Sequence, residues 1–538
     1  MPLSADDRPS PLAAVTRAQR VALAVIVALG FAARIAALAN ARSTPGYAFE
    51  DPDGYMGQAL RLAGPEGWAW TFQAVTYTIN GQQHALPPMY SVFLSAFARW
   101  PGFPLSAQVA QTILAAVSIA LVFALGRRMH CARSGLVAAA VYALWVPNIL
   151  NVWSTSQETV YVPLILAGFV LLARAIDRDD RPLAFFAAGF VFGAAALTRS
   201  MPMFFAIPAA CAHVLLARHR RRAAAQGLAF LVGFLLLTAP YSAALSRHFG
   251  QITLIDTHGS IHVESASGTR APGLLETAEG LWRTISARPA EYFAECAARA
   301  QSLLHVNGGR ILQTYVLAGS KPGAIAWKAI AHLGSDVPLV LGAVLAAFGA
   351  ALCRRPRIAL ILLLWTAINI GVASLGGFGG ARLRAPFEPL LVVLAAVVCV
   401  GGWRHAHPAA LAAAGLTGIV AAAAVLPQVP PSLRSWPDYG IAWPSIFSRP
   451  VGRFSGAAGL NVPAFDGVAT LTAATETSSP IRLRVRVGGV DVQTVDLAPG
   501  RTRTIRTPWP ARGLAFVELE QIGPSPGRPV IEVHVPGR

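Results

Sequence analysis

The chain has 538 residues, of which 54% are hydrophobic and only 13% are charged, and its formal net charge is +18 at pH 7. Soluble domains carry about 25% charged residues, so this composition excludes a soluble multidomain enzyme and indicates a polytopic membrane protein. Many of the arginines lie in short connections between apolar segments. Membrane topology accounts for arginines in such places, and this argues against nucleic-acid binding.

In chain order, about eleven apolar stretches approach the roughly 20 residues that a membrane-spanning helix needs. They are 21–39, 105–125, 136–150, 159–175, 183–197, 201–216, 224–245, 337–352, 358–375, 390–402 and 409–426. The sequence therefore predicts a mainly α fold, built as a polytopic membrane helical bundle.

Every second connection between these spans is rich in arginine, and the positive-inside rule places such connections in the cytoplasm. These connections carry Arg127, Arg128 and Arg133; Arg174, Arg178 and Arg181; Arg218, Arg220, Arg221 and Arg222; Arg354, Arg355 and Arg357; and Arg404. The N-terminus is then cytoplasmic. Three segments are predicted to face the outside: residues 40–104, residues 246–336 and everything after Pro427.

Two interpretations of the first apolar segment stay open. Ala37-Leu38-Ala39 has the small residues of a signal-peptide cleavage site. Arg34 interrupts the apolar run and favours a retained membrane anchor, with its side chain snorkelling outward. In both cases the residues that follow lie outside the membrane.

An acidic cluster of Glu50, Asp51 and Asp53 follows the first span and is itself followed by Tyr55. A carboxylate is costly in hydrocarbon, so three of them at a membrane surface indicate a water-filled site that performs chemistry. Asp is also a favoured N-cap residue. Capping of a helix that begins near Gly54 is therefore the alternative role of Asp51 and Asp53.

The same external segment continues to a double proline, Pro87-Pro88, and to Tyr90. The prolines open an amphipathic stretch typical of a helix that lies in the membrane interface. The sequence thus predicts amphipathic helices in this external loop. We interpret the preceding His84 as an exposed loop histidine rather than a ligand contact.

Ionisable residues also lie near the external ends of later spans. Glu158 opens the fourth predicted span, Arg199 follows the fifth, and Arg382 and Arg384 precede the tenth. Cations in a low-dielectric setting stabilise phosphate charge strongly, so these arginines are candidate phosphate ligands. Helix capping by Glu158 and interfacial anchoring by the arginines are the alternatives.

Beyond residue 427 the chain changes character. Prolines 427, 430, 431 and 437 form a linker. Ile481, Leu483 and Val485 then alternate with arginines, which is the period of a half-buried strand, and the arginines are interpreted as its solvated face. Similar runs at 514–519 and 530–535 complete the pattern. The sequence predicts a small external β-sandwich over residues 428–538, separate from a membrane domain over residues 1–427.

The segments of the membrane domain, in this order, resemble the GT-C glycosyltransferases that use polyprenyl-phosphate sugars. This superfamily includes the protein O-mannosyltransferases and the enzyme that adds aminoarabinose to lipid A. Its donor-site loop reads Asp, three residues, Tyr, two or three residues and Ala, followed by Pro-Pro-x-Tyr. The matching residues here are Asp51, Tyr55, Ala59 and Pro87-Pro88-Met89-Tyr90.

Three downstream segments extend the resemblance over roughly residues 20–400. Glu158 falls at a Ser-Glu-Thr of the family, with Gln157 in place of the Ser. Leu197-Thr198-Arg199 with Pro202 resembles the Leu-Thr-Arg-Pro turn. Arg382 and Arg384 begin a match to Arg-x-Arg-x-Pro-x-x-Pro.

The resemblance implies inverting transfer of a sugar from a polyprenyl-phosphate donor to an acceptor hydroxyl, at the external face of a bacterial inner membrane. The acceptor is a protein, a lipid or a polysaccharide. Asp51 is then the general base that takes the proton of the hydroxyl. Glu50, Asp53, Tyr55 and Glu158 support the acidic site; Pro87, Pro88 and Tyr90 belong to the donor loop; and Arg199, Arg382 and Arg384 bind the donor phosphate. The phosphate leaves as a stable anion and needs no acid. No cofactor is required, and a divalent metal is an alternative that the sequence does not support.

Alternatives remain for one motif and for the function. His258, His262 and Glu264 have a spacing that suits a metal, but without a fourth ligand an acceptor-binding loop is favoured. A transporter or flippase for a lipid-linked substrate is the runner-up function, since ionisable groups also mark translocation paths. The sequence lacks the repeated halves that many transporters show. A non-catalytic sugar-binding membrane protein is the third interpretation.

Overall fold

The computed structural model describes most of the bundle and the strands of the C-terminal region. The described residues are 14–43, 55–64, 76–79, 82–152, 156–178, 181–257, 272–303, 337–376, 381–400, 415, 452–454, 457–465, 468–475, 481–487, 490–499, 501, 503–508, 513–522 and 531–534.

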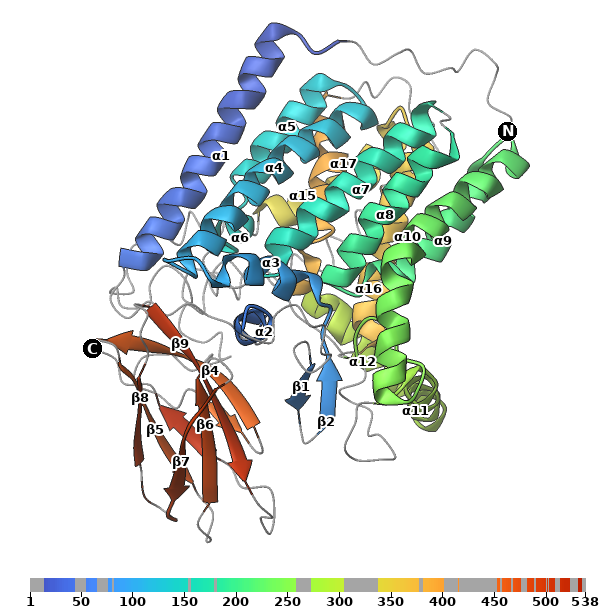
Figure 1. Ribbon diagram of the computed structural model, residues 1–538. Helices are drawn as coiled ribbons and strands as arrows, with labels where there is room; N and C mark the ends of the chain where they lie inside the picture. The colour runs from blue at the N-terminus through green and yellow to red at the C-terminus, as the bar shows by residue number, and fades with distance from the viewer. Residues whose placement is uncertain are drawn as a thin grey trace.

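The helices pack side by side in one bundle, with shorter elements gathered at one end (Figure 1). They are α1 (Arg17–Ser43), α2 (Tyr55–Leu62), α3 (Met89–Ala98), α4 (Leu105–Met129), α5 (Ala132–Ala143), α6 (Val146–Leu150), α7 (Glu158–Arg178), α8 (Pro182–Thr198), α9 (Pro202–Leu216), α10 (Arg220–Phe249), α11 (Leu274–Ala287), α12 (Pro289–Leu303), α15 (Val337–Leu352), α16 (Pro356–Leu375), the 3₁₀ helix η5 (Ala381–Arg384) and α17 (Glu388–Val400). A short hairpin of β1 (Thr76–Ile79) and β2 (Gln82–Ala85) precedes α3.

The prediction of a mainly helical membrane protein is confirmed. Every predicted span up to residue 400 overlaps a helix. Five helices are long and apolar enough to cross a membrane: Arg17–Ala39, Leu105–Met129, Glu158–Arg178, Arg220–Phe249 and Pro356–Leu375. Shorter apolar helices occupy four further predicted positions: Pro182–Thr198, Pro202–Leu216, Val337–Leu352 and Glu388–Val400. The last predicted span, 409–426, lies outside the described residues except for position 415.

One predicted span is interrupted. The stretch 136–150 is not continuous, because α5 ends at Ala143 and α6 starts only at Val146. Trp145 between them has an extended backbone, and Pro147 stands in the first turn of α6. Proline suits the first turn of a helix because its missing N–H would be unpaired there anyway. The proline therefore begins a new helix rather than continuing α5.

Helices α8 and α10 approach each other with their backbones almost in contact. A Cβ atom at Gly189 would collide with the carbonyl oxygen of Phe230, and one at Gly233 would collide with that of Phe186. Small residues allow such close packing of membrane helices. The contact therefore fixes α8 and α10 relative to each other, and with them the ends of both helices.

This packing predicts that Gly189→Ala destabilises the protein. The new methyl group meets backbone that cannot move aside without separating the helices, and overpacking of this kind costs about 1–3 kcal/mol. Thermal unfolding in detergent should show a clear fall in Tm. Gly371→Ala in α16 is the matched control, since a Cβ there meets nothing within 4 Å. An equal shift in the two variants would contradict the prediction.

Asp177 forms ion pairs that join three of the predicted arginine-rich connections at one end of the bundle. Its Oδ2 pairs with Arg128 Nη1 at 3.3 Å and its Oδ1 with Arg355 Nε at 2.9 Å. These residues lie at the α4–α5, α7–α8 and α15–α16 connections, so the three connections meet as predicted. The elements α2, α3, β1 and β2 lie at the opposite end (Figure 1). That the arginine-rich end faces the cytoplasm stays a prediction.

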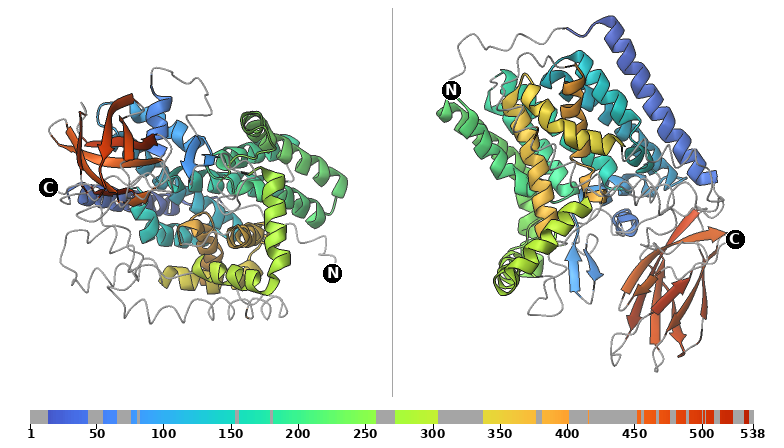
Figure 2. Two further views of the ribbon diagram at one scale, coloured as in Figure 1. Left: turned by 90° about the horizontal axis from the view of Figure 1, so that it is seen from below. Right: turned by 180° about the vertical axis from the view of Figure 1, so that it is seen from behind.

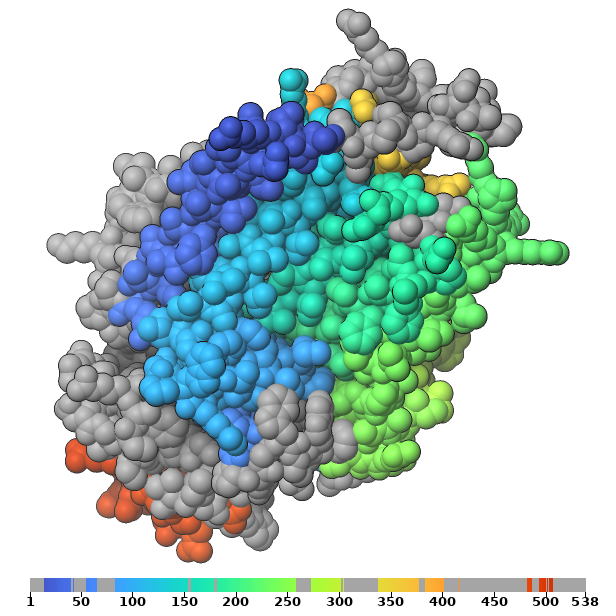
Figure 3. All heavy atoms as spheres, turned by 45° about the horizontal axis from the view of Figure 1, so that its top comes forward, coloured from blue at the N-terminus to red at the C-terminus, as the bar shows by residue number. Residues whose placement is uncertain are grey.

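Helix α1 lies along the flank of α4 and α5, where it forms a ridge on the surface (Figure 3). Val21, Val25 and Leu29 on its outer face are exposed, as expected of side chains that meet lipid. The prediction that Arg34 snorkels outward is wrong. Its side chain is buried, and Nη1 donates to the carbonyl oxygens of Gly30 at 2.9 Å and Ala143 at 3.1 Å, which hold it inside the bundle.

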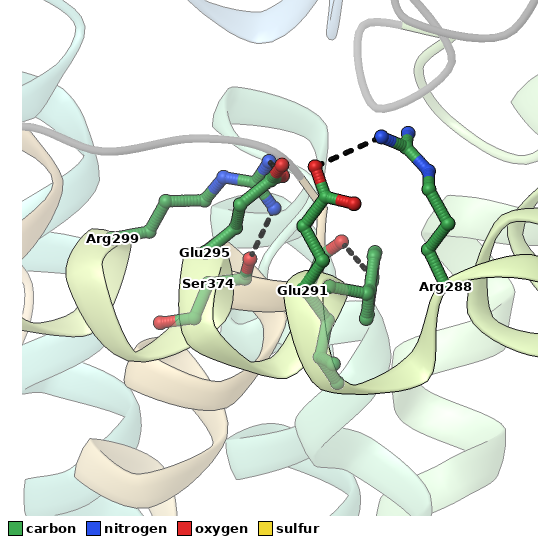
Figure 4. A network of polar contacts seen from close by, with 7 residues as sticks. Arg288, Glu291, Glu295, Arg299 and Ser374 are labelled. Atoms are coloured by element: carbon green, nitrogen blue, oxygen red, sulfur yellow. Dashed lines mark hydrogen bonds and ion pairs between the residues drawn. The ribbon is translucent and has the colours of Figure 1, made fainter.

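Helix α12 crosses the end of α16 (Figure 2). Arg299 Nη1 donates to the carbonyl oxygen of Ser374 at 3.3 Å, and its Nη2 to Glu295 at 2.6 Å (Figure 4). The Tyr292 hydroxyl donates to the carbonyl oxygen of Leu375 at 2.8 Å. Burial, followed by the neighbouring Cys296, raises the pKa of Tyr292, so this donor keeps its proton at neutral pH. These bonds fix α12 across the last turn of α16.

The C-terminal strands pair antiparallel in the order β3-β10-β5-β4-β9-β6-β7, with β8 paired to β5. The strands are β3 (Gly452–Phe454), β4 (Ala457–Phe465), β5 (Val468–Thr475), β6 (Ile481–Val487), β7 (Val490–Leu497), β8 (Arg503–Pro508), β9 (Gly513–Ile522) and β10 (Ile531–His534). In β6 the side chains of Ile481, Leu483 and Val485 are buried, whereas Arg482 is exposed and pairs with Asp496 at 2.8 Å. The predicted alternation is thus confirmed. A separate external domain over 428–538 stays a prediction.

Candidate active site

The acidic cluster itself, Glu50, Asp51 and Asp53, lies outside the described residues. The helix expected after it is present, since α2 begins at Tyr55. The roles predicted for the three carboxylates therefore stay predictions. The structure describes the residues that follow the three carboxylates, from Tyr55 to Gly64.

Two tyrosines of the predicted donor loop meet in a small core at the end of the bundle opposite the arginine-rich connections. The rings of Tyr55 and Tyr90 are edge to face, with centroids 5.0 Å apart. The Tyr55 hydroxyl donates to Gln157 Oε1 at 2.8 Å, and the Tyr90 hydroxyl donates to Gln111 Oε1 at 2.6 Å. Pro87 and Pro88 are buried beside this core. The tyrosines thus join α2, α3 and α4 to the segment that leads into α7.

Glu158 and Arg199, predicted separately from the sequence, form an ion pair. Arg199 Nη1 lies 2.5 Å from Glu158 Oε1, and the Ser156 hydroxyl donates to Glu158 Oε2 at 2.7 Å. The side chain of Glu158 is only 1% exposed, whereas that of Arg199 is 13% exposed. A buried carboxylate requires such a partner. The start of α7, where Glu158 stands, also favours negative charge.

Arg199 reaches Glu158 because α8 ends at Thr198. Arg199 has an extended backbone, with φ −157° and ψ 129°, so the chain leaves the helix axis at this residue. Pro202 then begins α9. The predicted Leu-Thr-Arg-Pro turn is therefore a tight connection between two helices that presents its polar side chains at the bundle end.

The residue after Arg199 holds a second carboxylate, which the sequence analysis missed. The Ser200 hydroxyl donates to Asp256 Oδ2 at 2.6 Å. Asp256 lies in the segment that follows α10, two residues before His258. The available signal was an acidic side chain in the predicted external segment that follows α10, which ends at Phe249. One short turn therefore contacts carboxylates from two different elements.

The segment before the double proline is held by hydrogen bonds to α10 and to the segment that follows α10. Ala85 N–H donates to Thr257 Oγ1 at 3.0 Å, and Thr257 N–H donates to the Ala85 carbonyl oxygen at 3.3 Å. The Tyr241 hydroxyl donates to the carbonyl oxygen of Leu86 at 2.9 Å. His84 is buried, with Nδ1 3.3 Å from Thr257 Oγ1. Its interpretation as an exposed histidine is therefore wrong, because this main-chain pairing encloses it.

Arg384 lies in η5 and is already paired within the protein. Its Nε lies 2.5 Å from Glu388 Oε1, and Nη1 donates to the carbonyl oxygen of Leu303 at 3.3 Å. The Arg384 side chain is 1% exposed. The side chain of Arg382 lies outside the described residues. Of the predicted phosphate ligands that the structure describes, Arg199 is thus more accessible than Arg384.

Among the described residues, no group of three His, Cys, Asp or Glu side chains gathers at one place. His258, His262 and Glu264 lie outside the described part of the chain, as does Asp51.

Comparison with known families gives one match. Residues 85–244 match the family described as dolichyl-phosphate-mannose-protein mannosyltransferase. This segment runs from the end of β2 into α10 and contains Pro87, Pro88, Tyr90, Glu158 and Arg199. The resemblance to protein mannosyltransferases that the sequence indicates is thereby confirmed over residues 85–244. None of the curated proteins matches the chain.

Solved structures of two enzymes are similar at low identity. The oligosaccharyltransferase AglB from Archaeoglobus fulgidus, in complex with an inhibitory peptide and a dolichol-phosphate, is 14% identical, with a TM-score of 0.43. The match covers 78% of this chain and 56% of AglB. ArnT from Cupriavidus metallidurans, bound to undecaprenyl phosphate, is 15% identical, with a TM-score of 0.45 over 76% of this chain and 64% of ArnT. In these two matches the chain spans less than two thirds of the other protein's length.

Proposed function

We propose that the protein is an integral-membrane glycosyltransferase that moves a sugar from a polyprenyl phosphate to an acceptor hydroxyl with inversion at the anomeric carbon. One observation carries the proposal. The Glu158–Arg199 pair lies at the bundle end that also holds Tyr55 and Tyr90 of the predicted donor loop, and most of these residues fall in the matched family segment. The Tyr55–Gln157 bond links the two groups directly.

In this proposal Asp51 acts as the general base. The acceptor oxygen attacks the anomeric carbon from the face opposite the lipid phosphate, while its proton passes to the Asp51 carboxylate. The bond between the anomeric carbon and the phosphate oxygen breaks, and its electron pair leaves with the phosphate. Asp51 precedes Tyr55 by four residues, so the anchoring of Tyr55 also fixes the end of the loop that carries the base.

Arg199 is the proposed principal ligand of the donor phosphate. A fixed cation in a site of low dielectric stabilises the charge that develops on the leaving phosphate. Arg199 is partly exposed at the turn after α8 and can exchange Glu158 for a phosphate. Arg382 and Arg384 are the proposed second ligands, and Arg384 would have to leave Glu388 to take that role.

We place this reaction at the external face of a bacterial inner membrane, with the N-terminus in the cytoplasm and residues 428–538 outside. The arrangement is tested by labelling single cysteines after the five native cysteines have been replaced. Positions 45, 300 and 450 should react with an impermeant reagent in intact cells, and positions 130, 220 and 355 only after permeabilisation. A cytoplasmic position 300 would contradict the topology and separate Arg384 from the other site residues.

The decisive experiment is transfer by the purified protein. Incubation with radiolabelled polyprenyl-phosphate sugar and cell-envelope acceptors should release polyprenyl phosphate and give a labelled product. Movement of the intact lipid-linked sugar across proteoliposomes, without any transfer, would instead support a flippase. Binding of the sugar with neither transfer nor movement would support a non-catalytic sugar-binding protein.

A further inference from the structure

Tyr161 has a buried hydroxyl without a hydrogen-bond partner in the described part of the chain. Its side chain is 0% exposed. Two other buried tyrosines of the bundle do have partners: the Tyr142 hydroxyl donates to Asn148 Oδ1 at 3.3 Å, and the Tyr241 hydroxyl donates to the Leu86 carbonyl oxygen. A buried polar group left unpaired destabilises the fold. The position therefore calls for a functional explanation.

The surroundings of Tyr161 supply one. Tyr161 stands three residues after Glu158 on α7, a spacing that puts two side chains on the same face of a helix. The charges of both Glu158 and Arg199 act on its hydroxyl. A phenol can donate to a carboxylate, and each carboxylate oxygen can accept more than one hydrogen bond. The unused donor thus belongs to the helix face that also carries Glu158, about one turn further along α7.

The ion pair explains why such a donor is needed. If Arg199 moves to a donor phosphate, as the proposed function requires, Glu158 keeps its charge but loses its principal partner. Glu158 is 1% exposed, so water cannot replace the arginine. Breaking a buried pair by removing one partner is strongly unfavourable. The Ser156 hydroxyl still donates to Glu158 Oε2, and a further donor to the same carboxylate would offset part of the loss.

We propose that Tyr161 is a positioning residue whose hydroxyl donates to Glu158 when Arg199 leaves that carboxylate for the donor phosphate. This inference rests on the proposed function for its ligand, and on geometry for the exchange of partners. In the free protein Arg199 balances Glu158 and Tyr161 is idle. In the liganded protein Tyr161 and Ser156 hold Glu158, and Arg199 holds the phosphate.

A double-mutant cycle tests the exchange without any substrate. Arg199→Met removes the cation while keeping an apolar stem, which imitates its departure. Tyr161→Phe alone should leave Tm unchanged or raise it, because the hydroxyl has no partner. The same change in the Arg199→Met background should lower Tm, because Glu158 then depends on Tyr161. Equal shifts of Tyr161→Phe in both backgrounds would overturn the proposal.

Two controls sharpen the cycle. Tyr142→Phe removes a buried hydroxyl that has its own partner and should lower Tm equally in both backgrounds. Glu158→Gln added to Arg199→Met removes the buried charge, so Tyr161→Phe should no longer lower Tm there. Should Arg199→Met alone fail to fold, the exchange is tested by lipid-phosphate binding in variants that keep both Arg199 and Glu158.

Binding of undecaprenyl phosphate to the detergent-purified full chain gives the second measurement. Tyr161→Phe should raise Kd by roughly tenfold, the loss expected for one hydrogen bond to a charged group. Tyr142→Phe should leave Kd unchanged. An unchanged Kd for Tyr161→Phe beside normal wild-type binding would overturn the role of Tyr161 alone. A wild-type protein that binds no lipid phosphate would overturn the proposed function, and the exchange with it.

Discussion

Asp51→Asn should lower the turnover number by about 10²- to 10⁴-fold, the contribution expected of a general base. Asparagine has nearly the shape of aspartate and is as good a helix N-cap, so any capping role is retained. It cannot accept the proton of the acceptor hydroxyl. Single-turnover transfer from a labelled polyprenyl-phosphate sugar measures the loss directly. Expression, Tm and donor binding should stay close to those of the wild type.

The neighbouring carboxylates are the matched controls. Asp53→Asn and Glu50→Gln should reduce turnover much less, since we expect these residues only to shape the acidic loop. A stable Asp51→Asn protein with normal turnover would remove Asp51 as the base. An inactive Asp53→Asn beside an active Asp51→Asn would keep the mechanism and move the base by two residues.

Arg199→Ala should weaken binding of the lipid-phosphate donor by about 2–5 kcal/mol, the usual loss when one partner of a buried charge pair is removed. The same change leaves Glu158 buried without its cation, so Tm should also fall. Arg199→Lys should rescue both properties poorly, because an ammonium lacks the planar fork of donors that a guanidinium offers to phosphate.

A charge-free pair separates the two effects. In Glu158→Gln with Arg199→Gln neither buried charge remains, and the two amides can bond to each other, so Tm should recover toward the wild-type value. Donor binding should remain weak because the cation is still missing. Recovery of donor binding together with Tm would show that Arg199 only holds Glu158 and does not bind the phosphate.

Much of the fold could be predicted because apolar stretches and arginine-rich connections have direct physical meaning in a membrane. The positions of α4, α7 and α16 follow from hydropathy, and the meeting of Arg128, Asp177 and Arg355 follows from the alternation of connections. The break between α5 and α6 was missed because one proline changes the mean hydropathy of a long apolar stretch very little, although Pro147 stands in the first turn of a new helix.

The candidate site was predicted residue by residue but not as a set of contacts. Glu158 and Arg199 were each assigned from their motifs, yet only the fold shows that they are partners. Asp256 and Tyr161 were missed because an acidic residue after a span and an aromatic residue within one have no distinctive pattern. The buried His84 and Arg34 contact residues distant in sequence, Thr257 and Ala143, which local composition does not reveal.

The glycine contact between α8 and α10 has a consequence for how the site keeps its dimensions. The contacts at Gly189 and Gly233 fix the two helices in one register. The distance from Arg199 to the segment after α10 is therefore set by the number of helical residues between these contacts and the helix ends. An α-helix advances 1.5 Å and turns about 100° per residue. One residue inserted in α8 after Gly193 would therefore swing Arg199 to a different face, even with every side chain preserved. The number of residues from these glycines to the helix ends thus determines where the site residues lie. We expect insertions and deletions within α8 and α10 to be tolerated far less than those in the connections beyond them.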